Sequence, residues 1–269
     1  MSFKPLNKIV LVTLCLLSCL FFLDITFESS RSYAAPAIVW DYQGTENPQN
    51  WGQSFPTCAA GQNQSPINIV TANAQDLDNI SFHYQPFPLH ILNNGRTVQV
   101  NSDRHSSITI DHQDYLLKQF HYHSPSEHAI NGQTFPAELH LVHQSPDRDQ
   151  YAVVSVFLTA EGGERLTSGI AENLAYKPLL DHLPLQESPE TDLKLTIDPA
   201  QLLPVDQTTY RYSGSLTTPP CTEAVNWLIM ATPVQLSSQQ IQTLQQAFDG
   251  NNRPLQVQGN RLIIQDVTP

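Results

Sequence analysis

The chain has 269 residues, with 13 Lys and Arg against 25 Asp and Glu and a formal net charge of −12. An acidic chain is repelled by phosphate backbones and anionic lipid surfaces, so nucleic acid and anionic membrane are excluded as expected partners. The length is sufficient for one domain with a substantial core, or for two small ones.

Residues 1–34 have the pattern of a signal peptide. Two lysines precede an apolar run over residues 9–23, and Ser32-Tyr33-Ala34 supplies small residues at the −3 and −1 positions. Cleavage after this site leaves residues 35–269, exported to the periplasm or secreted, with no stable membrane anchor. An uncleaved anchor stays open, because the run is only slightly shorter than the ~18 residues of a spanning helix. A lipoprotein signal fits less well, since apolar residues continue past Cys19.

Residues 40–58 are rich in Asn, Gln, Pro and Gly and predict an irregular, aromatic-anchored lead-in. Short apolar or alternating runs typical of strands follow at 80–84, 89–92, 97–100, 107–110, 115–123, 138–143, 151–159, 193–197 and 224–232. Asn94-Gly95 predicts a hairpin between two of them. Helical signals are few: Ser237-Ser238 supplies an N-cap before a predicted helix over 239–248, and a weaker signal covers 167–174. The pattern predicts a mixed α/β, sheet-dominated single domain with minor surface helices.

Cys58 and Cys221 are the two cysteines that lie outside the predicted signal peptide. A single pair in an exported protein is typical of a disulfide, with two free buried thiols as the alternative. Neither cysteine has an evident base beside it, so neither is expected to act as a nucleophile.

Three histidines on two of the predicted strands indicate a metal site. His121 and His123 are two residues apart, and side chains at i and i+2 of a strand emerge on one face. If a neighbouring strand places His140 on that face, three neutral nitrogen donors converge. That is the ligand count of a catalytic zinc site, with the fourth position open. The His-x-His pair alone is a weak indication, because polar strand faces often carry histidines.

Gln119 and Glu138 strengthen the metal hypothesis. By the same two-residue period, Gln119 shares a face with His121, and Glu138 shares one with His140. Metal-bound imidazoles usually donate their second ring N–H to a carbonyl or carboxylate, and both residues offer such an acceptor. Polar side chains on an inward face are costly unless they satisfy one another.

Motifs along nearly the whole of residues 35–269 resemble the α-class carbonic anhydrases. In the order of that family they are Gln64-Ser65-Pro66-Ile67-Asn68-Ile69, Leu92-Asn93-Asn94-Gly95, the run from Gln119 to His123, Ser126-Glu127-His128, the run from Ala137 to His143, the run from Tyr212 to Pro220, and Asn251-Asn252-Arg253-Pro254. The resemblance implies a catalytic domain around a large, twisted, mostly antiparallel sheet with one Zn²⁺ in a conical cleft. It implies reversible hydration of carbon dioxide to bicarbonate and a proton. Cys58 and Cys221 resemble the disulfide pair of exported members.

The resemblance also implies roles for single residues. Thr217 would accept a hydrogen bond from the zinc-bound nucleophile and donate its own proton toward Glu127. Asn251 would orient His123 through its backbone carbonyl, and Thr218 would contact bicarbonate. An apolar wall that receives carbon dioxide would consist of Val142, Val153, Leu216, Val225 and Trp227. The donor set does not by itself select zinc over other divalent ions, and the oligomeric state stays open.

One position departs from the family pattern. Fast members carry a histidine after Leu-Asn-Asn-Gly that relays the proton from the metal site to buffer, whereas this chain has Arg96. Arginine is effectively always protonated and cannot release a proton near neutral pH. We therefore expect the proton to leave by another group, by a water chain along Tyr42, or directly to small buffers.

Two other functions stay open. A catalytically silent relative could serve as a binding module, but such relatives typically lose a zinc histidine. A zinc hydrolase could act on esters, since a metal-activated water attacks activated carbonyls. The narrow apolar wall and the lack of an acid for the leaving group favour weak esterase activity only as a side reaction.

Overall fold

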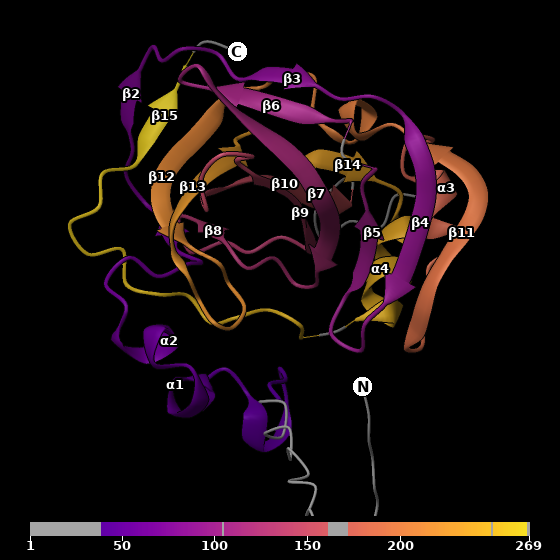
Figure 1. Ribbon diagram of the computed structural model, residues 1–269, viewed down its shortest axis with the longest axis horizontal. Coiled ribbons are helices and arrows are strands. Elements are labelled where there is room, and N and C mark those ends of the chain that lie inside the picture. Colours follow the sequence, from indigo (N-terminus) through magenta and orange to yellow (C-terminus); the bar gives the residue numbers. More distant parts are fainter. Residues whose placement is uncertain (1–38, 104, 161–171, 249, 268–269) are drawn as a thin grey trace, which may run out of the picture. The chain divides into compact units, whose positions relative to one another are not determined.

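A computed structural model describes residues 39–103, 105–160, 172–248 and 250–267 (Figure 1). These residues belong to one compact unit. The predicted signal peptide over 1–34 and most of the weakly predicted helix over 167–174 lie outside the described residues. Among the described residues, none of the helices has the length and apolar character needed to cross a membrane.

Thirteen strands of the described chain form one large mixed sheet. Ten of them follow one path, in the order β11 (Ser188–Ile197), β4 (Phe87–Asn93), β5 (Val98–Asn101), β7 (Gln113–His123), β9 (Ala137–Gln144), β10 (Tyr151–Ala160), β13 (Glu223–Met230), β12 (Thr209–Ser215), β15 (Ile264–Asp266) and β2 (Asn73–Gln75). Along this path only β10–β13 and β15–β2 are parallel pairs. The predicted sheet-dominated, mostly antiparallel fold is confirmed.

Shorter strands complete the sheet at its sides. β14 (Val234–Leu236) pairs in parallel with β10, while β6 (Ser107–Ile110) pairs with both β7 and β3 (Ser81–His83). A separate two-stranded ladder joins β1 (Asn68–Ile69) to β8 (Ala129–Ile130). Figure 1 shows the strong twist of the large sheet, with β4 and β11 on one side and β12 and β13 on the other.

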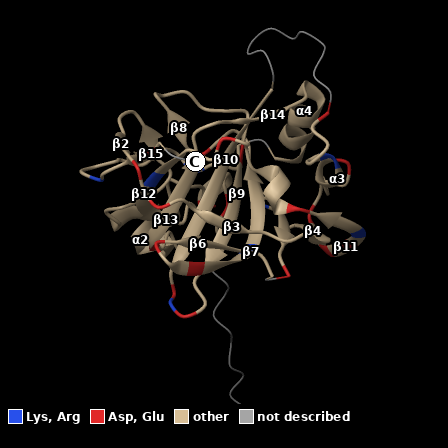
Figure 2. Ribbon diagram, turned by 90° about the horizontal axis from the view of Figure 1, so that it is seen from above, with Lys and Arg blue, Asp and Glu red and all other residues tan. Residues whose placement is uncertain are grey.

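The helices are short and peripheral, as predicted. They are η1 (Gly44–Glu46), α1 (Trp51–Ser54), α2 (Pro56–Ala60), α3 (Lys177–Leu180), η2 (Pro199–Leu202) and α4 (Ser238–Ala247). α4 confirms the helix predicted after Ser237, whose side chain accepts from the Gln240 N–H in a capping box. Figure 2 shows the charged residues mainly in loops and at strand ends around the sheet.

The two faces of the sheet carry two hydrophobic clusters, and this division positions the histidines. On β7, Phe120 and Tyr122 belong to the larger cluster. His121 and His123 alternate with them and face the opposite side. That side holds the smaller cluster, which includes Val153 on β10. β10 is buried over most of its length, because both of its faces are covered.

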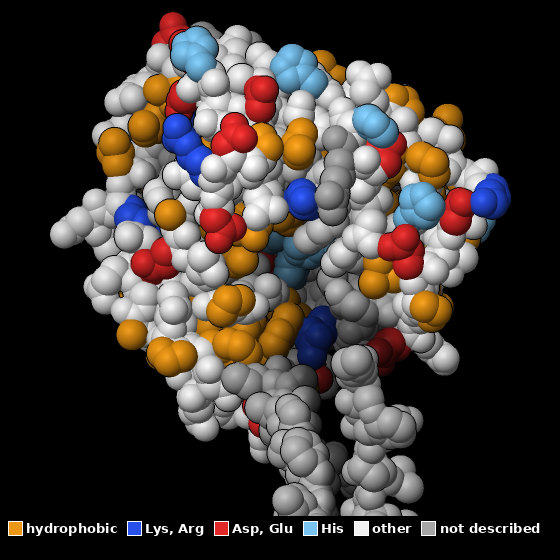
Figure 3. All heavy atoms as spheres, in the orientation of Figure 1, with side chains coloured by type: hydrophobic (Ala, Val, Ile, Leu, Met, Phe, Trp, Pro, Cys, Tyr) orange, Lys and Arg blue, Asp and Glu red, His pale blue; other side chains and the backbone are white. Residues whose placement is uncertain are grey.

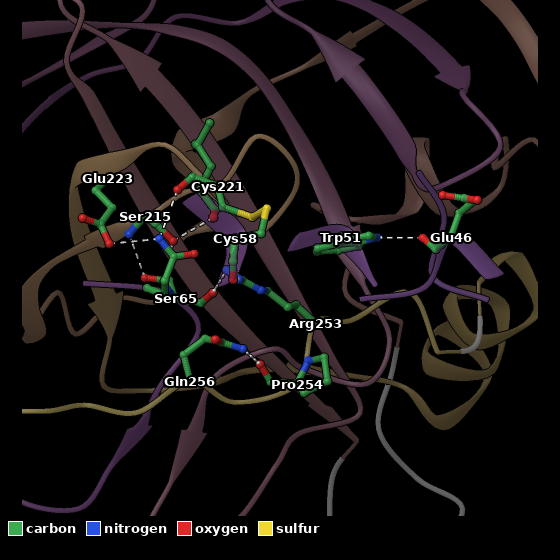
Figure 4. The surroundings of a disulfide bond; sticks show 12 residues. Glu46, Trp51, Cys58, Ser65, Ser215, Cys221, Glu223, Arg253, Pro254 and Gln256 are labelled. Carbon is green, nitrogen blue, oxygen red and sulfur yellow. Dashed lines mark hydrogen bonds between the residues drawn. A yellow bond between two sulfur atoms is a disulfide. The ribbon is translucent and has the colours of Figure 1, made fainter. Parts of the chain in front are cut away.

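A disulfide ties the start of the described chain to the loop between β12 and β13. Cys58 and Cys221 are bonded, with 5.1 Å between their Cα atoms, which confirms the predicted pair (Figure 4). Arg253 lies beside this bond, and its guanidinium donates to the carbonyls of Ser65 at 2.7 Å and Cys58 at 2.9 Å. Segments far apart in the sequence therefore meet at this disulfide.

Candidate metal centre

His121, His123 and His140 converge on one point. In the antiparallel β7–β9 ladder, His121 lies directly opposite His140. Each of the three offers one ring nitrogen, and these nitrogens all lie within 4.8 Å of one another. His123 and His140 are buried, while His121 is half-buried. Figure 3 shows histidine side chains inside a hollow on this face of the molecule.

An oxygen acceptor fixes the second nitrogen of each ring. Since these oxygens carry no proton, the facing ring nitrogens are the donors, and the remaining nitrogens keep their lone pairs for a metal. The bonds run from His121 Nδ1 to Gln119 Oε1 at 2.8 Å, from His123 Nδ1 to the Asn251 carbonyl at 2.7 Å, and from His140 Nε2 to Glu138 Oε1 at 2.8 Å. The acceptors are thus the side chains of Gln119 and Glu138 and the backbone carbonyl of Asn251.

The donor set fits a cation. With their other nitrogens protonated, His121 Nε2 and His123 Nε2 face each other as lone pairs 3.1 Å apart. Two such lone pairs repel unless a positive charge lies against both. Burial lowers the pKa of His121 well below its usual value and the pKa of His123 to about 4, and it also lowers the pKa of His140. Neutral imidazoles with one open position are the ligand type of catalytic zinc.

Glu138 is the centre of a hydrogen-bond network that sequence reasoning predicted only in part. Besides the His140 ring, its Oε1 accepts from His128 Nδ1 at 2.7 Å and from the Ser155 hydroxyl at 2.6 Å. Its Oε2 accepts the backbone N–H groups of Glu127 and His128, each at 2.8 Å. Burial alone would raise the pKa of Glu138, but His128 and His140 outweigh it and hold the pKa well below its usual range. Ser155 was missed, although it lies opposite His140 in the β9–β10 register.

Glu127 lies beside the three histidines. Its Oε1 accepts the backbone N–H of Arg253 at 2.8 Å, and its Oε2 lies 3.4 Å from His123 Nε2. Burial raises the pKa of Glu127 to about 7. Thr217, itself buried, is near enough to lower that pKa, although its hydroxyl does not complete a hydrogen bond of good geometry to Oε2. The role of Arg253 was missed because it acts through a backbone group.

The five residues of the predicted apolar wall pack in one cluster. Val153, Val225 and Trp227 are buried in it, and Val142 and Leu216 pack against it half-buried. In Figure 3, hydrophobic side chains border the hollow on its lower left. Thr218 is half-buried in the loop after Leu216, and its carbonyl accepts the Cys221 N–H at 2.9 Å.

Arg96 and Tyr42 are the two residues named above in connection with proton transfer. Tyr42 packs against a histidine of the centre, whereas the Arg96 side chain is bonded to Trp40. The Tyr42 ring lies 6.5 Å from the His123 ring. Burial, followed by the nearby Glu127 carboxylate, raises the pKa of Tyr42 well above its usual value. The half-buried Arg96 side chain is engaged with Trp40, to whose carbonyl its Nε donates at 2.8 Å.

Comparisons with known proteins agree with this geometry. Residues 46–267 match the family described as eukaryotic-type carbonic anhydrase. A carbonic anhydrase of Nostoc sp. is 38% identical over 242 residues, which cover 87% of this chain and 88% of that protein. One of Klebsiella pneumoniae is 37% identical, covering 85% and 92%.

Solved structures show the same relationship. The α-carbonic anhydrase of Thermovibrio ammonificans, in complex with the inhibitor sulfanilamide, aligns with a TM-score of 0.77 at 35% identity, covering 84% of this chain and 98% of that one. A dioscorin complexed with ascorbate aligns with a TM-score of 0.72 at 31% identity, covering 85% and 98%.

Proposed function

The chain belongs to the eukaryotic-type, or α-class, carbonic anhydrase family, and we propose that it catalyses the reversible hydration of carbon dioxide to bicarbonate and a proton at a zinc ion. His121, His123 and His140 would hold the ion. The observation that carries the proposal is the set of three neutral imidazoles, each fixed by its own oxygen acceptor, that leaves one side open toward an apolar wall.

Zinc would act as a Lewis acid that makes a water molecule nucleophilic at neutral pH. The residues of the chain would orient this chemistry. The Arg253 N–H fixes one oxygen of Glu127, which leaves the other oxygen to accept from the Thr217 hydroxyl. A Thr217 hydroxyl that donates to Glu127 can only accept from the nucleophile, and this sets the direction of the attacking lone pair.

The apolar wall would receive the substrate. Carbon dioxide offers almost no hydrogen bonds, so an apolar surface binds it without losing any. Val142 and Leu216 are half-buried and form the accessible part of this surface, while Val153, Val225 and Trp227 support it from behind. Bicarbonate is charged and is poorly held by such a wall, which favours release, and Thr218 would contact it at the rim.

We further propose that the proton leaves by a route other than a histidine at position 96. The Arg96 guanidinium does not titrate near neutral pH and is already bonded to Trp40. Small buffers at the mouth of the hollow, or waters along Tyr42, would take the proton instead. Export also remains a proposal: the disulfide between Cys58 and Cys221 supports a signal peptide over 1–34 and a catalytic domain over 35–269 in the periplasm or medium.

Stopped-flow hydration of carbon dioxide tests the function, with the zinc-loaded protein, the chelator-treated protein and a His140→Ala variant measured alongside an ester substrate. We expect fast hydration that is lost in the last two samples and restored to the chelated protein by zinc. Hydration no faster than in buffer, despite bound zinc, would refute the proposal. Chelator-sensitive ester hydrolysis without hydration would assign the ester reaction instead.

A further inference from the structure

Arg96 makes two contacts with one residue of the N-terminal segment. Its Nε donates to the Trp40 carbonyl at 2.8 Å, and its guanidinium carbon lies 4.3 Å from the centre of the Trp40 ring. The first contact fixes the backbone at residue 40, and the second fixes the side chain by a cation–π interaction. A flat guanidinium makes both at once, which an ammonium group does not.

Trp40 is the outer member of an aromatic cluster that reaches the metal site. The Trp40 ring lies 5.7 Å from Tyr42 and 5.3 Å from Trp51, and Tyr42 in turn lies 5.7 Å from Trp51. The Tyr42 ring then meets the His123 ring edge-on at 6.5 Å. A chain of ring contacts therefore leads from Arg96 to a predicted zinc ligand.

Residues 39–46 have little secondary structure to hold them in place. Only η1 (Gly44–Glu46) interrupts the irregular backbone. Other side chains also hold the segment: the Trp51 indole N–H is shared between the carbonyls of Asp41 and Glu46, each at 2.9 Å (Figure 4 shows the contact with Glu46). Asn50 Nδ2 donates to the Thr45 carbonyl at 3.0 Å, and Asn47 Nδ2 donates to the Gly44 carbonyl at 2.9 Å. The position of Tyr42 therefore depends on side-chain contacts, of which Arg96 supplies the one from the β4–β5 turn.

The backbone of Arg96 is itself fixed to the metal site. Its carbonyl accepts from Asn251 Nδ2 at 3.0 Å, and the Asn251 carbonyl accepts from His123 Nδ1 at 2.7 Å. On the other side, the Arg96 N–H donates to Asn94 Oδ1 at 3.0 Å within the turn. The arginine is thus a rigid support on which the N-terminal segment rests.

We propose that Arg96 is a positioning residue, which holds residues 39–46 against the hollow so that Tyr42 stays packed on His123. A position that serves proton relay when it is a histidine would here serve to fasten the wall of the site. The comparison with a proton-relay histidine rests on the proposed function. The placement of the segment does not.

Hydrogen exchange of the zinc-loaded protein, followed by mass spectrometry, tests the fastening. Arg96→Lys keeps the charge but loses the Nε–H bond and the flat stacking surface, so we expect about tenfold faster exchange over residues 39–46 and unchanged exchange in β7 and β9. Arg148→Lys, an exposed arginine in the loop after β9, is the matched control and should change neither. In a Trp40→Ala background, Arg96→Lys should change the exchange rate over residues 39–46 by less than twofold, because the ring that Arg96 stacks on is already absent.

The His123 ring supplies a second signal, which a general loss of stability does not move. With ¹⁵N-labelled histidine, its Nδ1–H resonance should shift in Arg96→Lys and in Trp40→Ala but not in Arg148→Lys, because Tyr42 leaves the ring. The proposal would be overturned if Arg96→Lys exchanged residues 39–46 at a rate within twofold of the unaltered protein. It would also be overturned if Arg96→Lys accelerated this exchange as strongly in the Trp40→Ala background as in the unaltered protein. A protein that shows the coupled exchange but does not hydrate carbon dioxide would refute the proposed function and keep the role of Arg96.

Discussion

Replacement of Glu138 by glutamine tests the hydrogen-bond network of the metal centre most directly. The carboxylate accepts five hydrogen bonds, three on Oε1 and two on Oε2. Glutamine has nearly the same shape, but one end of its amide is a donor. If the NH₂ group replaces Oε2, it meets the fixed backbone N–H groups of Glu127 and His128. If it replaces Oε1, His140 can avoid it only by moving its proton to Nδ1, the nitrogen predicted to bind zinc.

Both placements cost free energy, because each leaves at least two buried donors facing a third. An unmet buried hydrogen bond costs roughly 1–3 kcal/mol, and breaking a buried charged pair costs about 3–5 kcal/mol. We therefore expect Glu138→Gln to lower the free energy of unfolding of the metal-free protein by about 3–5 kcal/mol at pH 7. Zinc affinity should fall by about 10- to 100-fold, since the acceptor that orients His140 is impaired.

Urea unfolding of the chelated protein and competition for zinc with a chromogenic chelator measure the two effects. The control is Glu187→Gln, the same substitution at an exposed glutamate, which should change neither quantity. An unfolding free energy within ~0.5 kcal/mol of the unaltered protein, together with zinc affinity within about threefold, would show that the network does not hold His140 as described.

Four further outcomes are expected. Burial lowers the pKa of His143 to about 3, so between that pH and about 6.5 the unfolded chain binds more protons than the folded chain. The contribution of His143 to the unfolding free energy should be fully present above pH 6.5 and fall by up to ~1.4 kcal/mol per pH unit below it. His143→Gln should flatten this slope in urea titrations at pH 4–7. Arg96→His should raise turnover in weak buffer, and equal stopped-flow rates in weak buffer would contradict the proposed proton route. Cys58→Ser combined with Cys221→Ser opens a link across 163 residues and should lower the unfolding free energy by about 3–5 kcal/mol in urea. Val142→Tyr places a phenol on the apolar wall and should reduce kcat/KM at least about tenfold by blocking substrate, with zinc affinity unchanged in the chelator assay as the control.

The fold was predictable where a strand has one apolar and one polar face. On β7, Phe120 and Tyr122 alternate with the histidines, and this alternation alone indicates both the strand and the side of the site. β12 was missed because its sequence, Thr209–Ser215, carries no aliphatic residue and has a glycine one residue before its end. That glycine is required by packing, since a Cβ at Gly214 would lie 2.2 Å from Ser65 Oγ. Strands of two or three residues, such as β1 and β15, are too short to show a period.

The candidate site was likewise predictable only in part: residues on the same strand as a histidine could be found, and distant backbone groups could not. Gln119 and Glu138 share a strand with the histidine that each contacts, so the two-residue period reaches them. Asn251 and Arg253 act on His123 and Glu127 through a backbone carbonyl and a backbone N–H. Every residue but proline offers both groups, so no residue type marks such a position, and the distance of more than a hundred residues hides the pairing. Only the resemblance pointed to Asn251, and Arg253 became visible in the structure.

The contacts of Asn251 and Arg253 also set an order of events during synthesis. The His123 ring lacks its acceptor, and the Glu127 carboxylate its N–H donor, until the segment over residues 251–253 has been made and has docked. A nascent chain that still lacks this segment carries all three histidines but has no acceptor to fix the His123 ring. Formation of the complete centre is therefore tied to the synthesis and docking of residues 251–253, which follow the last of the three histidines by more than a hundred residues.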